Sequence, residues 1–294
     1  MEKEKTNYFT VTPMSQRVSL KPGQVYEGSI TVINPANSEI DFDYKAEVTP
    51  YGVVGEEYAA DLATKSNYTM ITDWVTIKEP TGTLKPNNSK KIEYTIKVPE
   101  NAPAGGQYAT IAVSQNQDSA SKEGGVAVSN VFQMASLIYG EVEGETKHEG
   151  EILSNQIPGF VTNAPITLSV SIKNDGNVHE TATIEIVAKD FFSGNELIET
   201  ADDKNKYTEI VMPETTRVIE RDIVENLPAL GVVHVEQTVY YNGGTSKETK
   251  EVIICPIWFL ALVGVTIAAI IAVIVHIIRK HKKNKKQTEL EQAI

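Results

Sequence analysis

The stretch Ile40–Val48 reads IDFDYKAEV, in which apolar and polar side chains alternate without a break. Because successive side chains of a β-strand point to opposite faces of a sheet, this pattern predicts a strand with one buried and one solvent-facing side. Similar short runs occupy the chain on both sides of it, separated by turn residues such as Lys21-Pro22-Gly23 and Pro99–Gly106. No helical stripe of useful length precedes residue 252. The sequence therefore predicts an all-β chain up to that point.

Residues 8–145 contain enough of these runs for about seven to nine strands, the number found in an immunoglobulin-like β-sandwich. Between residues 51 and 73 the alternation fails, and we interpret this segment as an insert. It carries Tyr51, Tyr58 and Tyr68. Loops on a rigid sandwich often hold recognition residues, and tyrosine provides contact area at a small entropic cost, so these tyrosines are candidate contacts for a ligand or partner. The alternative is an insert that packs on its own sheet.

The second half of the chain repeats three features of the first half in the same order. The first feature is an asparagine at the end of a strand, Asn34 in the first half and Asn174 in the second. The second is an apolar residue two positions before a proline, in Leu84-Lys85-Pro86 and in Val211-Met212-Pro213. The third is a strand that follows a glycine, Gly106 or Gly231. We infer two tandem sandwiches, the second within residues 150–241; chance similarity of strand and turn sequences is the alternative. The boundary is expected around Gly144–Asn155, because the stretch Glu143–Glu151 (EGETKHEGE) contains no apolar residue.

Residues 252–278 (VIICPIWFLALVGVTIAAIIAVIVHII) contain no formal charge. At ~1.5 Å per residue a helix of this length reaches ~40 Å, more than the ~30 Å of hydrocarbon in a bilayer. We therefore predict one transmembrane helix, with Pro256 in its first turn and the crossing itself beginning near Ile257. Residues 242–251 are expected to form a stalk between the second sandwich and the membrane. The residues expected at the two membrane interfaces are Trp258 and Phe259 on the outer side and Arg279, Lys280, Lys282 and Lys283 on the inner side.

Charge predicts the orientation of this helix. The chain has a net charge of -12, whereas its tail at residues 279–294 is basic. Short segments rich in Lys and Arg stay in the cytoplasm, so we expect a cytoplasmic tail and an extracellular acidic region before the helix, in a single-pass protein of the cell membrane. The alternative is a tail-anchored protein whose bulk lies in the cytosol. Residues 1–7 (MEKEKTN) lack the apolar core of a signal peptide, so we further expect that an export signal has been removed and that Met1 is not the native start.

Composition narrows the class of protein further. The single cysteine, Cys255, lies at the predicted membrane boundary, so the extracellular region has no disulfide of its own. This favours a bacterium with one membrane over an animal secretory pathway. The acidic balance argues against a nucleic-acid partner, because the region before the helix repels phosphates.

Signals of catalysis are missing from the sequence. The five histidines show no metal-ligand spacing and are interpreted as surface residues. There is no G-x-S-x-G elbow, no phosphate-binding G-x-x-x-x-G-K, and no cysteine before the membrane boundary to pair with a histidine. We interpret Trp74 as a core residue. The sequence therefore predicts a protein that is not an enzyme, with no catalytic residues, no metal site and no cofactor.

The first half also contains a set of short motifs: Phe9–Pro13, Leu20–Gly23, Val32–Asn34, Trp74-Val75, Leu84–Pro86, Val98-Pro99 and Ala104–Tyr108. Together they resemble the amino-terminal domain of the WxL-interacting proteins, which are surface proteins of Gram-positive bacteria. The resemblance implies two immunoglobulin-like domains, a C-terminal helix and a Lys-rich tail, with the first domain associated with peptidoglycan and the second with host or WxL proteins. The second half departs from the family at Asn174–His179, and no binding residue is carried over.

These observations lead to one function hypothesis and two alternatives. We expect a non-enzymatic, membrane-anchored cell-surface protein that holds a wall polymer such as peptidoglycan, or a partner surface protein, near the bilayer. The first alternative is an extracytoplasmic assembly factor that, like a pilus-type chaperone, offers a strand edge to a client. The second alternative is a subunit of a larger membrane complex, because the small residues of the helix allow close contact with another helix.

Overall fold

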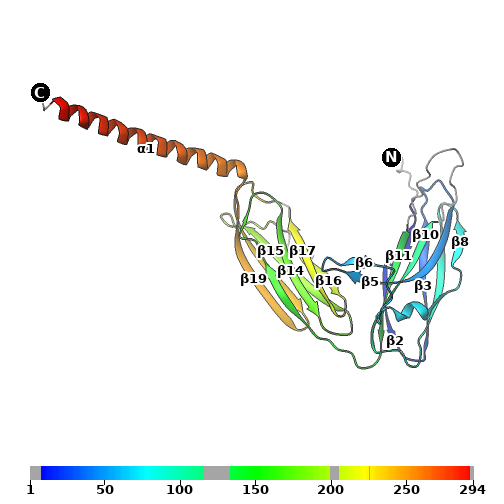
Figure 1. Ribbon diagram of the computed structural model, residues 1–294. Helices are drawn as coiled ribbons and strands as arrows, with labels where there is room; N and C mark the ends of the chain where they lie inside the picture. The colour runs from blue at the N-terminus through cyan, green and yellow to red at the C-terminus, as the bar shows by residue number, and fades with distance from the viewer. Residues whose placement is uncertain (1–7, 116–132, 199–204, 225, 292–294) are drawn as a thin grey trace.

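The computed structural model describes residues 8–115, 133–198, 205–224 and 226–291, with side chains as far as Lys280 (Figure 1). Up to residue 254 the described regular structure consists of β-strands and one short 3-10 helix, and a long helix follows, α1 (Ile257–Glu291). The strands form two sandwiches, each made of two sheets. The prediction of an all-β chain with two tandem immunoglobulin-like sandwiches and one C-terminal helix is confirmed.

The first sandwich packs a four-stranded sheet on a five-stranded sheet. In order, the four strands are β1 (Thr10–Thr12), β3 (Val25–Asn34), β9 (Asn88–Lys97) and β7 (Val75–Ile77), and the five are β2 (Ser15–Leu20), β11 (Gln133–Val142), β10 (Gly105–Gln115), β4 (Phe42–Pro50) and β8 (Thr81–Leu84). The alternating apolar residues Phe42, Tyr44 and Ala46 of β4 are buried in the core. Trp74 is 7% exposed and belongs to the same core, as predicted.

The second sandwich repeats this arrangement with a three-stranded and a five-stranded sheet. The three strands are β12 (Gly150–Gln156), β14 (Ile166–Asn174) and β17 (Thr215–Ile223), and the five are β13 (Phe160–Val161), β19 (Gly244–Ile254), β18 (Gly231–Tyr241), β15 (Glu180–Asp190) and β16 (Lys206–Val211). In both five-stranded sheets the first edge strand runs parallel to its neighbour, β2 beside β11 and β13 beside β19, and the other pairings are antiparallel. The two sandwiches therefore share one topology.

A buried asparagine occupies the same place in both sandwiches. Asn34, at the end of β3, donates from its side-chain amide to the Leu84 carbonyl (2.9 Å). Asn174, at the end of β14, donates in the same way to the Val211 carbonyl (2.9 Å). Each asparagine also donates to a second carbonyl in the loop that follows its strand. Leu84 and Val211 are the residues that the sequence comparison paired, so the predicted repeat is confirmed at the level of hydrogen bonds.

The insert at residues 51–73 has regular structure of its own. It contains the two-stranded hairpin of β5 (Gly52–Val54) and β6 (Ala59–Asp61) and the 3-10 helix η1 (Met70–Asp73). Figure 1 shows the hairpin leaving the first sandwich and bridging the space towards the second. The described residues between β15 and β16 of the second sandwich form no such hairpin.

The stalk predicted at residues 242–251 is wrong. Gly244–Ile254 is β19, which pairs along its whole length with β18 and contributes Val252 and Ile254 to the core of the second sandwich. The uncharged run that begins at Val252 therefore contains the end of a strand before it contains the helix. Cys255 and Pro256 alone separate β19 from α1.

Helix α1 contains a segment, Ile257–Lys280, that is long and apolar enough to cross a membrane. It has 24 residues and a mean hydropathy of 2.8, and its most apolar stretch is not buried against the sandwiches. It begins where the crossing was predicted to begin. Trp258 and Phe259, predicted at the outer interface, lie in the first turn of this segment. Of the residues predicted at the inner interface, Arg279 and Lys280 lie at its far end. Lys282 and Lys283 lie beyond it, where the structure describes no side chains. Their role at a membrane stays a prediction.

Candidate functional site at the junction of the two sandwiches

The β5–β6 hairpin holds the second sandwich through Tyr58, the residue just before β6. Its hydroxyl forms a hydrogen bond with the Thr215 hydroxyl and accepts one from the Met212 N–H (2.9 Å). Beside it, the Val218 N–H on the outer edge of β17 donates to the Glu56 carbonyl in the hairpin turn (2.8 Å). Burial raises the pKa of Tyr58, so its hydroxyl stays protonated at neutral pH. The insert therefore adds both side-chain and backbone bonds to an edge strand of the other sandwich.

Arg217 of β17 lies over the ring of Tyr58, with its guanidinium carbon 4.6 Å from the ring centre. A cation–π contact of this kind contributes about 0.5–2 kcal/mol, depending on how far it is removed from water. Arg217 also pairs with Glu209 (2.7 Å), which in turn pairs with Arg221. The side chain of Glu209 is only 17% exposed, so the carboxylate is enclosed between two arginines beside the hairpin.

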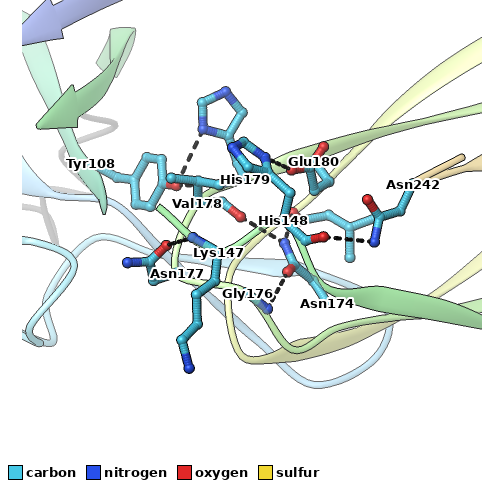
Figure 2. A network of polar contacts seen from close by, with 11 residues as sticks. Tyr108, Lys147, His148, Asn174, Gly176, Asn177, Val178, His179, Glu180 and Asn242 are labelled. Carbon is cyan, nitrogen blue, oxygen red and sulfur yellow. Dashed lines mark hydrogen bonds and ion pairs between the residues drawn. The ribbon is translucent and has the colours of Figure 1, made fainter. Parts of the chain in front are cut away.

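A second contact joins the sandwiches near the linker that follows β11. The loop after β14 presents Asn177, whose carbonyl accepts a hydrogen bond from the Gly106 N–H at the start of β10 (2.7 Å). The side-chain oxygen of Asn177 accepts another from the Lys147 N–H of the linker (2.7 Å; Figure 2). Gly105 has a φ of +114°, and a Cβ at this position would lie 2.6 Å from the Asn177 carbonyl oxygen. The close approach of the two sandwiches here therefore requires glycine.

Tyr108 of β10 crosses the junction beside this loop. Its hydroxyl accepts a hydrogen bond from the His179 N–H (2.8 Å) and lies 3.2 Å from His179 Nδ1 (Figure 2). Burial lowers the pKa of His179, and Arg17 lowers it further, so the imidazole is neutral and its Nδ1 is able to accept a hydrogen bond from the Tyr108 hydroxyl. Burial raises the pKa of Tyr108, which keeps that hydroxyl protonated. The two side chains form a neutral pair that spans both sandwiches.

Five tyrosines gather where the insert meets both sandwiches, and we call them the tyrosine cluster: Tyr51, Tyr58, Tyr68, Tyr108 and Tyr139. The rings of Tyr51 and Tyr108 lie edge-on to that of Tyr139, with ring centres 6.2 and 5.9 Å away. Burial raises the pKa of Tyr68 to about 12. Burial also raises the pKa of Tyr139, so at neutral pH the hydroxyls of Tyr58, Tyr68, Tyr108 and Tyr139 are uncharged.

Two cavities open beside the tyrosine cluster. One of about 180 Å³ is lined by Tyr51 and Tyr68 together with residues such as Met212 of the second sandwich. The other, of about 280 Å³, is lined by Tyr51 and Tyr58 together with Arg217. Both are smaller than the ~300–1,000 Å³ of a site for a drug-sized ligand, so each has room for a single ring or side chain of a larger partner.

The structure brings together all three tyrosines predicted as contact residues. Tyr51 borders both cavities, Tyr68 the first and Tyr58 the second. Their contact with a ligand or partner stays a prediction. The insert does not pack on its own sheet alone, because Tyr58 bonds to the second sandwich.

The sequence analysis missed most of the other residues of this site, among them Arg217, His179 and Tyr108. The prediction that all five histidines are surface residues is wrong for His179, which is half-buried and faces Tyr108 across the junction. Its bonding partner lies 71 residues earlier in the chain, and no motif connects the two. Within the residues that the structure describes, no group of three or more His, Cys, Asp or Glu side chains is placed to hold a metal ion. The junction offers hydrogen bonds, ring faces and an arginine–glutamate–arginine group.

Among the residues that the structure describes, no strand covers the outer edge of β11 at its start. Strand β2 pairs with β11 only from Leu137 onwards, so the outer side of Gln133–Ala135 faces no strand among the described residues. The Leu137 N–H donates outwards to the Met14 carbonyl (2.9 Å). Because N–H groups alternate in direction along a strand, those of Gln133 and Ala135 point outwards as well. Unpaired edge groups of this kind are a template for an added strand.

No family model and no curated protein matches the chain. Solved structures similar to it include the class 5 fimbriae chaperone CfaA, with 15% identity and a TM-score of 0.39 over 83% of this chain and 99% of that one. A chain of the Salmonella enterica SafA pilin–SafB chaperone complex has 12% identity and a TM-score of 0.39 over 85% and 98%. A chain of the CsuC–CsuE chaperone–tip adhesion subunit complex from Acinetobacter baumannii has 11% identity and a TM-score of 0.39 over 83% and 98%. Similarity at this level carries no argument about what the chain binds.

Proposed function

We propose that this chain is a non-enzymatic binding protein that α1 anchors in the cell membrane, and that it holds an extended segment of a partner protein at the open edge of β11. The observation that carries the proposal is the pair of outward N–H groups at Gln133 and Ala135. Adding a strand to such an edge supplies main-chain hydrogen bonds for any sequence, while alternate side chains supply selectivity. This supports the assembly-factor alternative over a protein that holds a wall polymer.

In the proposed arrangement the sandwiches lie outside the cell and the basic tail lies inside. The Lys- and Arg-rich residues 279–286 support this orientation, because such segments stay in the cytoplasm. The short connection between β19 and α1 keeps the second sandwich at the bilayer. The junction then sets the direction in which the first sandwich, with its open edge, extends away from the membrane.

The test of this proposal removes one outward N–H. Ala135→Pro deletes a donor that points away from β10, and edge strands tolerate proline at such positions. With a photo-crosslinking residue in place of Gln133 of the full chain in native membranes, we expect a protein adduct that Ala135→Pro abolishes. The control carries the crosslinking residue at Leu153, an exposed position on β12 of the second sandwich. An adduct that survives Ala135→Pro, or that forms equally at Leu153, would contradict pairing at this edge.

A wall polymer is the second candidate partner. It is supported by the tyrosine cluster, whose ring faces and hydroxyls suit the C–H faces and hydroxyl groups of sugars, and by the resemblance to the WxL-interacting proteins. Tyr68→Ala is expected to weaken sedimentation of the detergent-solubilised full chain with purified peptidoglycan, while Tyr240→Ala, outside the cluster, leaves it unchanged. Equal loss in both variants, or no sedimentation of the wild-type chain, would remove this candidate.

A further inference from the structure

Exposed apolar side chains gather at one end of the second sandwich. Among the described residues from β12 to β19, eight large hydrophobic side chains are exposed, and all but Leu153 and Tyr240 lie at the end from which α1 leaves. We call these six the apolar rim: Phe160, Phe191, Phe192, Val224, Leu230 and Ile253. Single exposed apolar residues are ordinary on a protein surface, but a concentration of them at one end marks a contact surface.

Strand register places the rim next to the start of α1. Ile253, one residue before the end of β19, pairs with Phe160 on one side and with Val232 on the other. The Val232 carbonyl in turn accepts a hydrogen bond from the Phe191 N–H (3.0 Å). Figure 1 shows α1 leaving the second sandwich at the end away from the linker to the first sandwich. The rim therefore surrounds the exit of the helix.

The turn after β15 holds two phenylalanine rings out from the sandwich. The Asp190 carboxylate accepts hydrogen bonds from the Phe192 N–H (3.1 Å), the Ser193 N–H (2.7 Å) and the Ser193 hydroxyl (2.8 Å). The rings of Phe191 and Phe192 meet edge to face, with centres 5.3 Å apart, and these residues are 53% and 79% exposed. Because the turn is held by its own hydrogen bonds, the two rings are displayed without packing against the core.

No flexible tether separates the rim from α1. The Cys255 N–H donates to the Val161 carbonyl (2.9 Å), so Cys255 still belongs to the sandwich, and the Pro256 carbonyl already accepts the first bonds of the helix. The three steps from Ile254 to Ile257 span at most ~11 Å. The headgroup region of a bilayer is ~5–8 Å thick on each side. A helix that starts to cross at Ile257 therefore brings the end of the sandwich to the depth of the headgroups.

We propose that the apolar rim lies in the headgroup region of the lipid bilayer, with Phe191 and Phe192 inserted among the lipids beside α1. The inference rests on the proposed anchoring of the chain by α1. Aromatic rings are favoured at this depth, because they bury apolar surface at the boundary of the acyl chains. The helix and the rim then give the second sandwich two separate attachments to the bilayer. Together they set its tilt and, through the junction, the direction of the open edge of β11.

The experiment measures the depth of single labelled positions in the reconstituted full chain. Cys255→Ser removes the only native thiol, and an environment-sensitive fluorophore is attached in turn after Phe192→Cys, Leu153→Cys and Ile267→Cys. The chain is placed in phosphatidylcholine–phosphatidylglycerol vesicles containing a lipid with a nitroxide on its headgroup or on its acyl chain. Position 192 tests the rim, position 153 is an exposed apolar control elsewhere on the sandwich, and position 267 reports whether α1 is inserted.

We expect the label at position 192 to lose most of its emission to the headgroup nitroxide, the label at 267 to be quenched by the acyl-chain nitroxide, and the label at 153 to be unaffected. Quenching at 267 without quenching at 192 would overturn the rim proposal and leave the anchor intact. Absence of quenching at 267 would overturn the anchoring on which it rests. Equal quenching at 192 and 153 would also overturn the proposal, because it would show that the fluorophore itself enters the bilayer.

Discussion

The two sandwiches share a topology, but their corresponding edges differ in charge. In the first, the open stretch of β11 is Gln133–Ala135 and carries no charge. In the second, β13 covers β19 only at Ile253 and Ile254, and the uncovered part of β19 carries Lys247, Glu248, Lys250 and Glu251. Charged side chains on an edge strand oppose pairing with another chain. The comparison indicates that the edge of the second sandwich is protected and that of the first is available.

The insert is the other difference between the two copies. It reaches from the first sandwich to β17 of the second, where Tyr58 contacts the hydroxyl of Thr215 and the guanidinium of Arg217. The second sandwich instead exposes apolar side chains near α1. In the proposed function, one scaffold would serve two purposes: the first copy displays an edge for a partner, and the second attaches that edge to the membrane through α1.

The largest expected effect comes from the feature that the copies share. Replacing Asn34 or Asn174 with alanine removes the side-chain donor to one buried carbonyl in each sandwich, that of Leu84 or of Val211, and we expect each substitution to lower the free energy of unfolding of its own sandwich by about 1–3 kcal/mol. Urea unfolding of the full chain measures the loss. Asn101→Ala, at an exposed position, is the control. A large loss at one asparagine and none at the other would break the equivalence of the two sandwiches.

We expect a smaller loss of stability when the contact between the insert and the second sandwich is removed. Tyr58→Phe removes the hydroxyl that the Met212 N–H and the Thr215 hydroxyl contact, and we expect a loss of about 1–2 kcal/mol. A double-mutant cycle with Thr215→Val, measured by urea unfolding, isolates the contact. We expect a coupling energy of about 0.5–2 kcal/mol between the two substitutions. Strictly additive losses would mean that the hairpin does not bond to the second sandwich in solution.

A charge substitution sharpens the comparison of the two edges. Ala135→Lys makes the open stretch of β11 resemble β19, and we expect it to weaken formation of the crosslinked adduct at Gln133 several-fold. Its effect on unfolding should stay within about 0.5 kcal/mol, because the position lies at an edge. Thr249→Lys on β19 is the matched change on the protected edge and should leave the adduct unchanged. An adduct insensitive to Ala135→Lys would contradict partner pairing at β11.

The smallest predicted effect is a pH dependence of the junction. The pKa of His179 is lowered in the folded chain from its ordinary value of 6.5, mainly by burial, so the unfolded chain binds more protons in the range just below 6.5. The stability of the junction should therefore be complete above that value and fall as the pH drops below it. His179→Gln should flatten this part of the profile, while His148 and His234 remain in both proteins as internal controls. An identical profile in the variant would show that His179 is not buried there.

Much of the fold was predictable because its signals are local. The alternation in Ile40–Val48 marks β4, and the repeated asparagine marks the ends of β3 and β14. Strand β19 was missed because its first part, residues 244–251, is polar on both faces and its apolar end runs directly into the uncharged helix. Strand β19 is held in the sheet by its backbone pairing with β18, which extends over its whole length and does not depend on alternating side chains.

The candidate site was predictable only in part. The three insert tyrosines could be identified, because tyrosines in a segment without strand periodicity are unusual enough to note. Their partners could not, because Tyr58 and Thr215 are 157 residues apart and meet only when both sandwiches are in place. The strands of the hairpin are also too short to show periodicity, since β5 and β6 have three residues each.

The central claim is that both sandwiches lie outside the cell, attached by α1. The most direct measurement adds a protease to intact cells that express the full chain and follows fragments with antibodies to the sandwiches and to residues 279–294. We predict that the sandwiches are digested while the helix and tail remain as a membrane-bound fragment. Sandwiches that stay intact until the cells are broken open would contradict the claim.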